Sequence, residues 1–311
     1  MSTANAQSNA TITDKEVICK TIESFLSKIE VPNAFMPIDQ KFYDICCKRA
    51  MDQGYPMGTD HTIPSIRPFM KTGVYLAFCA YGHLENEATR IFMALYTAFL
   101  VYVDVAFVRD SRNVRVFTER FIRNEKQMDI VLDSLAQFLL EIPDHWEPVV
   151  ASIILTATLN FITAPTLEYQ TQGMTASPHA EGYPGFLRQM SGAAESYGLM
   201  LFPRNLVLNS YIQSLPEVAN FLNFSNDVLS FYKEELEGDN VNYISVRARC
   251  QGVPAITAFQ QLSDEVARCH AQVCKILEMD QAAYDIWKKF TYGYTVFHLS
   301  CDRYRFAELM N

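Results

Sequence analysis

The sequence predicts a single all-α domain. Apolar residues recur at spacings of three and four along almost the whole chain, which is the period of a helix with one buried face. No run of alternating apolar and polar residues bounded by hairpin turns stands out, so no β-sheet is expected. The chain has 311 residues, of which 49% are hydrophobic, and this is enough apolar material for a large core.

The elements follow from this periodicity and from the turn residues that interrupt it. Residues 1–14 are polar and are expected to form a disordered tail, so that the domain spans 15–311. Proline and glycine turn signals divide the rest into about ten helices. Helical periodicity is found in the segments 15–29, 38–53, 64–81, 85–108, 112–140, 146–171, 183–198, 207–236, 253–278 and 281–306. Within 207–236, Ser214-Leu215-Pro216-Glu217 has the pattern of a capping box with proline in the first turn.

One of these helices is apolar enough to be compared with a membrane span. The stretch Ile91–Val108 contains a single charge, Asp104, and is just long enough to cross a bilayer. No second stretch of similar quality is evident. We therefore interpret it as a helix buried on all sides in a bundle, and we expect no membrane span.

Charge and reactive residues exclude several classes of function. The net charge is −9 and no basic patch is visible, so nucleic-acid binding is not expected. The eight cysteines form no CxxC pair, and the N-terminal segment lacks a signal peptide, so we expect a cytosolic protein with reduced thiols. The histidines show no metal-binding spacing and are expected to be structural or surface residues: His61, His83, His145, His179, His270 and His298.

Polar side chains interrupt an otherwise apolar helix in the stretch NDVLSFYKE. Asn226, Ser230 and Glu234 are four residues apart, so they share one face of a helix. They offer an amide, a hydroxyl and a carboxylate oxygen, a ligand set that suits Mg²⁺, and Lys233 could reach an anion held by the metal. A polar stripe that faces solvent, or ordinary hydrogen bonds between helices, would give the same spacing.

The whole nine-residue stretch, including Asp227 and Lys233, resembles the second metal motif of the class I terpene synthases, NDxxSxxKE. From about residue 60 to 306 the chain resembles fungal sesquiterpene cyclases of the trichodiene synthase-like group. Three further segments match in the expected order. They are GYPGFLRQMSG at 182–192, EGDNVNYISV at 237–246 and HLSCDRYRF at 298–306.

The resemblance implies roles for individual residues. Arg188 takes the place of the arginine that senses diphosphate, and Gly192, four residues on, that of the helix-break glycine. Arg303 and Tyr304 resemble the C-terminal Arg-Tyr pair of the family. Together with Lys233 they are expected to bind the substrate diphosphate. Simpler alternatives are a surface arginine at 188, a salt bridge from Arg303 to its neighbour, and a core tyrosine at 304.

The resemblance also implies a fold and a reaction. The expected fold is a class I terpenoid synthase-like helical bundle around an apolar active-site cavity. Members bind a prenyl diphosphate, usually farnesyl diphosphate, with three Mg²⁺ ions, and Mn²⁺ can replace them. Metal and basic residues stabilise the departing diphosphate, and the remaining cation cyclises in a dry pocket to a sesquiterpene hydrocarbon or alcohol. Relatives often dimerise, so a homodimer is an open expectation.

The chain departs from the family pattern at the aspartate-rich motif. In VYVDVAFVRD, Asp104 stands at the expected first aspartate, but Val105 replaces the usual adjacent carboxylate. A carboxylate in an apolar helix is costly unless it is paired or metal-bound, so Asp104 is expected to be a metal ligand. A hydrogen-bonded structural carboxylate is the alternative. Asp110 is expected at the surface or at a helix end.

Two other functions stay open at this point. A non-catalytic protein that binds prenyl diphosphates and derives from a cyclase has only Val105 in its favour. A chain-elongating prenyltransferase normally carries two DDxxD motifs, and this chain has neither. The sequence therefore favours the cyclase.

Overall fold

All regular elements of the described residues are helices. The computed structural model describes residues 12–60, 63–175, 177, 179–180, 182–239 and 242–309, and no strand occurs in that part of the chain. The first eight α-helices are α1 (Ile12–Lys28), α2 (Gln40–Asp52), α3 (Met70–Ala80), α4 (Glu87–Arg109), α5 (Ser111–Arg115), α6 (Phe117–Ile122), α7 (Ile130–Leu139) and α8 (Ile142–His145). The remaining eight are α9 (Pro148–Gln170), α10 (Tyr183–Gly192), α11 (Ala194–Leu199), α12 (Leu215–Glu237), α13 (Tyr243–Gln251), α14 (Ala255–Leu277), α15 (Gln281–Ser300) and α16 (Phe306–Leu309). Short 3₁₀ turns are η1 (Arg67–Phe69), η2 (Leu208–Ser210), η3 (Ile212–Ser214) and η4 (Asp302–Tyr304). The all-α prediction is confirmed.

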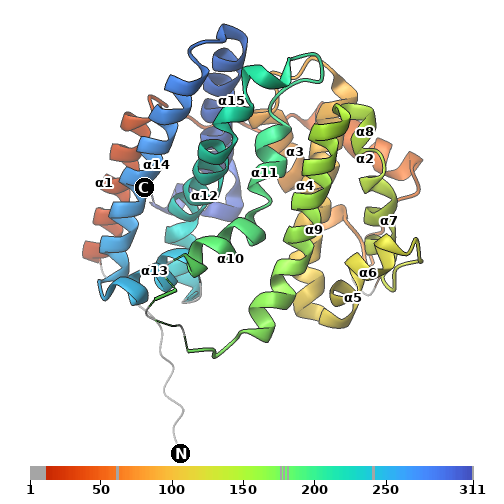
Figure 1. Cartoon of the computed structure of the whole chain (residues 1–311), viewed down its shortest axis with the longest axis horizontal. Coiled ribbons are helices and arrows are strands. Elements are labelled where there is room, and N and C mark those ends of the chain that lie inside the picture. Colours follow the sequence, from red (N-terminus) through yellow and green to blue (C-terminus); the bar gives the residue numbers. More distant parts are fainter. Residues whose placement is uncertain are drawn as a thin grey trace, which may run out of the picture.

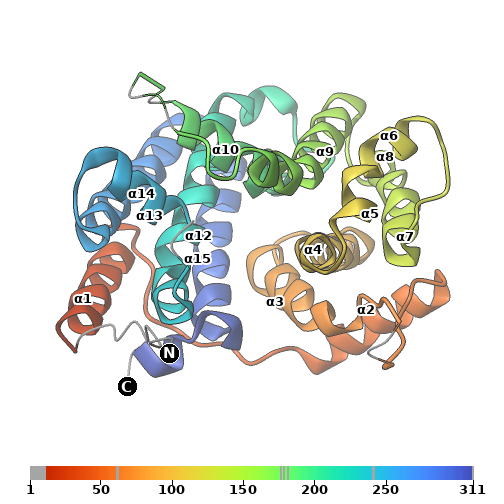
Figure 2. The same cartoon turned by 90° about the horizontal axis from the view of Figure 1, so that it is seen from below.

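The long helices pack as a bundle. In Figure 1, α12 lies between α14 and α1 on one side and α11, α3, α4 and α9 on the other. Seen from below, the ribbons of α4, α9, α10, α12 and α15 form a ring, and α3 lies between α4 and α15 (Figure 2). Helices distant in sequence therefore meet around one centre.

Helix α3 is held by backbone contact on two sides. A side chain at Gly73 would place its Cβ 2.1 Å from the carbonyl oxygen of Ala94 in α4. A side chain at Gly293, in α15, would place its Cβ 1.8 Å from the carbonyl oxygen of Cys79 in α3. Neither crossing has room for a methyl group, so α4 and α15 are both fixed closely to α3.

The apolar helix α4 forms the middle of the core. Its most apolar window has a mean hydropathy of 2.1, and 67% of that window is buried inside the protein. The expectation of a buried helix is confirmed for most of its length. A second helix, α9, also passes the length and composition test for a membrane span, with a mean hydropathy of 1.6, so the expectation of only one such stretch was wrong.

The segment 112–140 is not one helix, as predicted, but three short ones. The chain breaks after α6, where Asn124 has a left-handed backbone with φ of 54°. The buried carboxylate of Asp129 then caps α7 by accepting from the backbone N–H groups of Val131 and Leu132. Its second oxygen accepts from the Tyr102 hydroxyl at 2.6 Å. The demand of this buried carboxylate for partners overrides the helical periodicity of the segment.

Other helix boundaries also differ from the prediction. Helix α12 begins at Leu215, and 207–214 forms two 3₁₀ turns instead. Ser214 has a helical backbone and its hydroxyl donates to the Tyr211 carbonyl, so the predicted capping box is wrong. Helix α13 was not predicted, and α1 begins three residues before the predicted domain start at 15. The rest of the predicted tail, 1–11, lies outside the described residues.

Candidate active site

The metal-motif face of α12 meets three other elements. Asn226 lies 3.2 Å from His298 of α15 and 3.5 Å from the guanidinium of Arg188 in α10. The Glu234 carboxylate acts electrostatically on Arg188 and on Tyr304 of η4. The three polar side chains therefore do not face open solvent, and the solvent-facing alternative is excluded.

Ser230 has an unusual environment for a hydroxyl group. It is 3% exposed, and its Oγ has no hydrogen bond of normal geometry to any described residue. The hydroxyl is near enough to Glu234 to oppose part of the rise in the pKa of that carboxyl. A buried hydroxyl that lacks a good hydrogen bond costs free energy. The Ser230 oxygen is therefore available as a metal ligand, and it lies between Asn226 and Glu234 on the same helix face.

Glu234 holds its proton more tightly than an ordinary glutamate. Desolvation by the surrounding protein raises its pKa to about 7, and the nearby Asp227 carboxylate adds to the rise. The side chain is half-buried, so it stays accessible to a ligand. Lys233, next to it, forms an ion pair of 3.4 Å with Glu237 one turn on.

Arg188 reaches from α10 to α12 and is bound there by protein groups. Its Nε donates to both carboxylate oxygens of Asp227 at 2.9 Å, and Nη2 donates to the Asn223 carbonyl at 2.8 Å. Burial raises the pKa of the Asp227 carboxyl, and the guanidinium opposes that rise. Arginine does not lose its proton in proteins, and both oxygens of Asp227 accept from it, so the pair is ionic. The reading of Arg188 as a plain surface residue is excluded.

The helix break expected at Gly192 occurs directly after it. The predicted helix 183–198 divides at Ala193, whose φ of 47° is left-handed, into α10 and α11. A Cβ atom at Gly192 would lie 1.7 Å from the Asn223 Oδ1 and 2.9 Å from the Arg188 Nη1. Asn223 is buried, and neither atom of its amide has a partner among the described residues. Only glycine fits between these two side chains.

The Arg-Tyr pair lies in a turn and not in a helix, because α15 ends at Ser300 before the predicted end at 306. Tyr304 is buried, and the centroid of its ring lies 4.4 Å from the centroid of the His298 ring. Asp302 pairs with Lys71 at 2.7 Å, so the expected alternative of a salt bridge between neighbours 302 and 303 is wrong. Arg303 is exposed, and its charge opposes the rise in the pKa of Asp104 that desolvation causes.

Asp104, on α4, is accessible to water but strongly desolvated. Protein atoms around it raise the pKa of its carboxyl to about 6, and Arg303 opposes this rise. The charge of Arg303 acts on Asp104, so the turn that carries the Arg-Tyr pair is near enough to this carboxyl to influence it.

A second carboxylate near Asp104 was missed by the sequence reasoning. Glu168, near the end of α9, is exposed to water, and desolvation raises the pKa of its carboxyl. Its charge raises the pKa of Asp104, and the charge of Arg188 lowers the pKa of Glu168. No motif marks it, because its place next to Asp104 depends on how α9 packs against α4.

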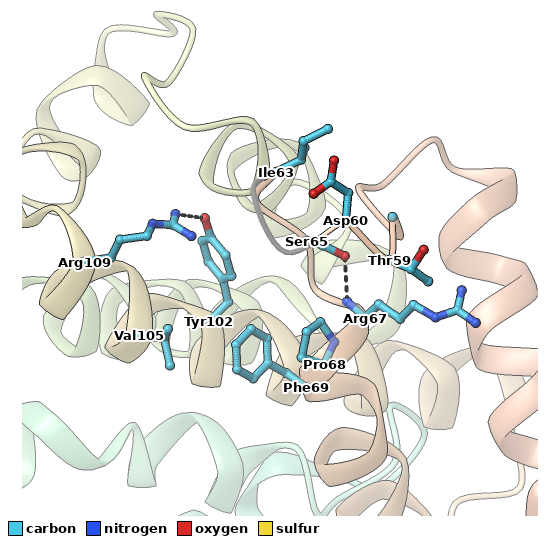
Figure 3. A pocket seen from close by; sticks show the side chains of 11 residues that line it. Thr59, Asp60, Ile63, Ser65, Arg67, Pro68, Phe69, Tyr102, Val105 and Arg109 are labelled. Carbon is cyan, nitrogen blue, oxygen red and sulfur yellow. Dashed lines mark hydrogen bonds between the residues drawn. The ribbon is translucent and has the colours of Figure 1, made fainter.

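The side chains of Val105 and Asp110 have surroundings different from those of the residues above. Val105 is 44% exposed and lines a separate pocket of about 420 Å³, together with Phe69, Tyr102 and Arg109 (Figure 3). None of the predicted site residues lines this pocket. Asp110 caps α5 by accepting from the Arg112 backbone and pairs with the Arg112 side chain at 2.8 Å. Its placement at a helix end agrees with the prediction.

The donors present fit a hard divalent cation. Asn226, Ser230 and Glu234 supply oxygens from one face of α12, and Asp104 supplies a carboxylate from α4. The buried Ser230 oxygen, which has no hydrogen bond of normal geometry to the described residues, is a group that such an ion would satisfy. In the part of the chain that the structure describes, no group of three His, Cys, Asp or Glu side chains has metal-binding geometry, and none of the eight cysteines forms a disulfide.

Comparison with known proteins agrees with this arrangement. Residues 61–311 match the family described as Trichodiene synthase (TRI5). The chain is 35% identical to the Alpha-cuprenene synthase COP6 of Coprinopsis cinerea over 303 residues, which are 97% of this chain and 93% of that protein. It is 28% identical to the Longiborneol synthase CLM1 of Gibberella zeae over 277 residues, covering 87% and 80% of the two chains.

The fold is also similar to that of a solved bacterial enzyme. The crystal structure of linalool/nerolidol synthase from Streptomyces clavuligerus superposes with a TM-score of 0.62 over 87% of this chain and 98% of that one. The sequence identity is 12%, so this likeness concerns the fold alone. It confirms the prediction of an all-α terpene synthase bundle. On the family match and the identity to curated relatives, this chain belongs to the trichodiene synthase family of terpene synthases.

Proposed function

We propose that this protein is a magnesium-dependent sesquiterpene cyclase that converts farnesyl diphosphate into a cyclic sesquiterpene and diphosphate. The observation that carries the proposal is the face of α12, where three oxygen donors lie against Arg188 and Tyr304 from other elements. Relatives named for the synthesis of trichodiene, α-cuprenene and longiborneol support a sesquiterpene product.

The proposed metal ligands are Asn226, Ser230 and Glu234 on α12 and Asp104 on α4. Bound Mg²⁺ would supply positive charge at the oxygens of the departing diphosphate. Glu234 and Asp104 must lose their protons to act as ligands, and their raised pKa values place this loss near neutral pH. Three ions are expected from the family resemblance, and Mn²⁺ is the alternative metal.

The proposed diphosphate contacts are Arg188, Lys233, Arg303 and Tyr304. When the bond between the allylic carbon and oxygen breaks, its electron pair goes to the diphosphate. In this proposal the three cationic side chains and the tyrosine hydroxyl stabilise the negative charge that develops there. Charge stabilisation of this kind is effective because the groups are fixed before the reaction.

The allylic cation that remains must react with its own double bonds before water captures it. A pocket that excludes water favours this outcome, and aromatic faces stabilise the positive charge. The reaction ends when a proton is lost to give a hydrocarbon, or when water adds to give an alcohol.

We further propose that the protein works in the cytosol, and that two copies associate as a homodimer.

The test is incubation of the purified protein with Mg²⁺ and, separately, with geranyl, farnesyl and geranylgeranyl diphosphate. Gas chromatography with mass spectrometry should detect a cyclic product mainly from farnesyl diphosphate, and none after chelation of Mg²⁺. A preference for geranyl diphosphate would instead indicate a monoterpene synthase. Monoterpene synthase 25 of Postia placenta, which is 28% identical over 99% of this chain, makes this a necessary comparison. Release of diphosphate with no product from any of the three would contradict a cyclase. Binding without turnover would favour the non-catalytic alternative.

A further inference from the structure

One buried histidine touches both a proposed metal ligand and a residue proposed to bind diphosphate. His298, near the end of α15, is fully buried. Its Nε2 lies 3.2 Å from the Nδ2 of Asn226, and its ring lies 4.4 Å from that of Tyr304. Its Nδ1 lies 2.8 Å from the carbonyl oxygen of Tyr294, one helical turn before it. Each ring nitrogen therefore has a polar neighbour, and the ring also packs against that of Tyr304.

These contacts decide which nitrogen of the ring carries the proton. A carbonyl oxygen only accepts hydrogen bonds, so Nδ1 of His298 must be the N–H that donates to Tyr294. His298 is fully buried and forms no ion pair with a carboxylate of the described residues, so its ring is neutral and has a single N–H. Nε2 is then an acceptor, and only the NH₂ group of Asn226 can face it.

The orientation of the Asn226 amide follows from this tautomer. The two arms of a side-chain amide point in different directions, so donation from Nδ2 to His298 turns Oδ1 away from the histidine. Oδ1 then faces Arg188, whose Nη2 lies 3.5 Å away. In the reversed amide, Oδ1 would meet the Nε2 lone pair, and the NH₂ group would meet both the guanidinium and any cation. Both contacts would be repulsive.

We infer that His298 is a positioning residue that holds the amide oxygen of Asn226 toward the metal position, so that the site is oriented before the ion arrives. This inference rests on the proposed function, because it takes Asn226 as a metal ligand. The histidine does not touch the ion in this role. Partners that orient metal ligands typically change metal affinity by about 10- to 100-fold when they are removed.

Three variants separate positioning from packing. His298→Phe keeps a planar ring but removes the acceptor for Asn226. His298→Gln keeps an acceptor, because its side-chain carbonyl can receive the Asn226 NH₂ group. His270→Phe is the matched control, because His270 is also buried and packs against Phe221 and Trp287 away from Asn226.

The measurement is the rise in melting temperature that Mg²⁺ and inorganic diphosphate together produce in each full-length variant, relative to its own value without them. We expect His298→Phe to need about tenfold more Mg²⁺ for half of the wild-type rise. His298→Gln should recover most of the difference, and His270→Phe should match the wild type. A long-range ¹H–¹⁵N spectrum of histidine-labelled wild-type protein should report the Nδ1–H tautomer for His298.

The outcomes distinguish this inference from the proposed function. If the wild type gains no stability from Mg²⁺ and diphosphate, the proposed metal site is wrong. If the wild type responds and His298→Phe responds at the same Mg²⁺ concentration, the positioning role of His298 is wrong while the metal site stands. An Nε2–H tautomer in the wild type would also overturn the inference, because Asn226 would then present its oxygen to the histidine.

Discussion

Arg188 and Asp227 form a buried ion pair in which one guanidinium nitrogen donates to both carboxylate oxygens at 2.9 Å. The arginine proposed to bind diphosphate is therefore already held by α12 before a ligand arrives. Its Nε and Nη2 groups are used for this, and Nη1 lies on the side of Gly192. The pair fixes the direction in which the guanidinium can meet an anion.

Loss of the Asp227 carboxylate should affect both stability and substrate binding. Asp227→Ala leaves a buried guanidinium without its anion and should cost about 3–5 kcal/mol in the free energy of unfolding. Asp227→Asn should cost less and raise KM for the prenyl diphosphate more than it lowers kcat, because Arg188 is misdirected but still present. Urea unfolding and steady-state kinetics measure the two effects. Unchanged KM in a folded Asp227→Asn protein would contradict the positioning of Arg188.

Two glycines of α10 should respond differently to the same substitution. Gly192→Ala would place Cβ 1.7 Å from the Asn223 Oδ1, so either Asn223 or the helix break must move. We expect a loss of stability of about 1–3 kcal/mol, as for other overpacked core sites, and a loss of activity. Gly185→Ala meets nothing within 4 Å and should be neutral or stabilising by about 0.5–1 kcal/mol. Thermal unfolding and product assays compare the two, and similar results for both would contradict the close approach.

The two aspartates of VYVDVAFVRD should contribute unequally to activity. Asp104→Asn removes a proposed ligand and should lower kcat/KM by about 100-fold or more, with a higher requirement for Mg²⁺. Asp110 caps α5 and pairs with Arg112, so Asp110→Asn should change kcat/KM by less than about threefold and cost at most about 1 kcal/mol of stability. Product formation over a range of Mg²⁺ concentrations measures both. Equal losses would mean that the two carboxylates act as a pair.

Ser230 should show opposite effects on stability and on activity. Its buried hydroxyl has no good hydrogen bond among the described residues, so Ser230→Ala should be neutral or slightly stabilising without metal. With one proposed ligand removed, the Mg²⁺ concentration for half-maximal activity should rise by about tenfold or more. A marked fall in the melting temperature of the metal-free variant would mean that the hydroxyl has a structural partner.

The stability of the metal-free protein should fall as pH rises through the pKa values of Asp104 and Glu234. Both carboxyls have raised pKa values in the folded protein, about 6 and about 7, because protein atoms desolvate them. The folded chain therefore binds these protons more tightly than the unfolded chain, and this contribution is lost between about pH 4 and pH 7. Mg²⁺ with diphosphate should stabilise more at about pH 8 than at about pH 5.5, since protons compete with the metal.

Calorimetry across this range, with Glu234→Gln for comparison, tests the assignment. The variant should have a flatter profile of melting temperature against pH, because one of the two protons is no longer exchanged. A profile as steep as that of the wild type would assign the titration to other groups.

The sequence predicts the all-α bundle and the α12 face because both depend on local spacing. Asn226 and Ser230 share a face of any helix that contains them, wherever that helix packs. The break at Ala193 was indicated only by the resemblance at Gly192, and the Asn223 side chain, which leaves room for glycine alone, lies 31 residues after Gly192.

What the sequence does not predict depends on contacts between distant segments. Glu168 has no motif, and it approaches Asp104 only because α9 packs beside α4. His298 was read as one of six histidines without metal spacing, because its role depends on which of its nitrogens faces α12. The break between α6 and α7 follows from a carboxylate that binds Tyr102 of α4. In each case the partner is far away in sequence.

The two glycine crossings of α3 bear on how the product spectrum of such an enzyme can change. Asp104 and His298 lie on α4 and α15, and both helices touch the backbone of α3 with no side chain between them at Gly73 and Gly293. Main-chain contact with α3 therefore sets the spacing of α4 and α15. In the proposed cyclase, a change of product therefore has to come from the size of side chains on α4 and α15, since neither helix can move away from α3 without opening one of these crossings.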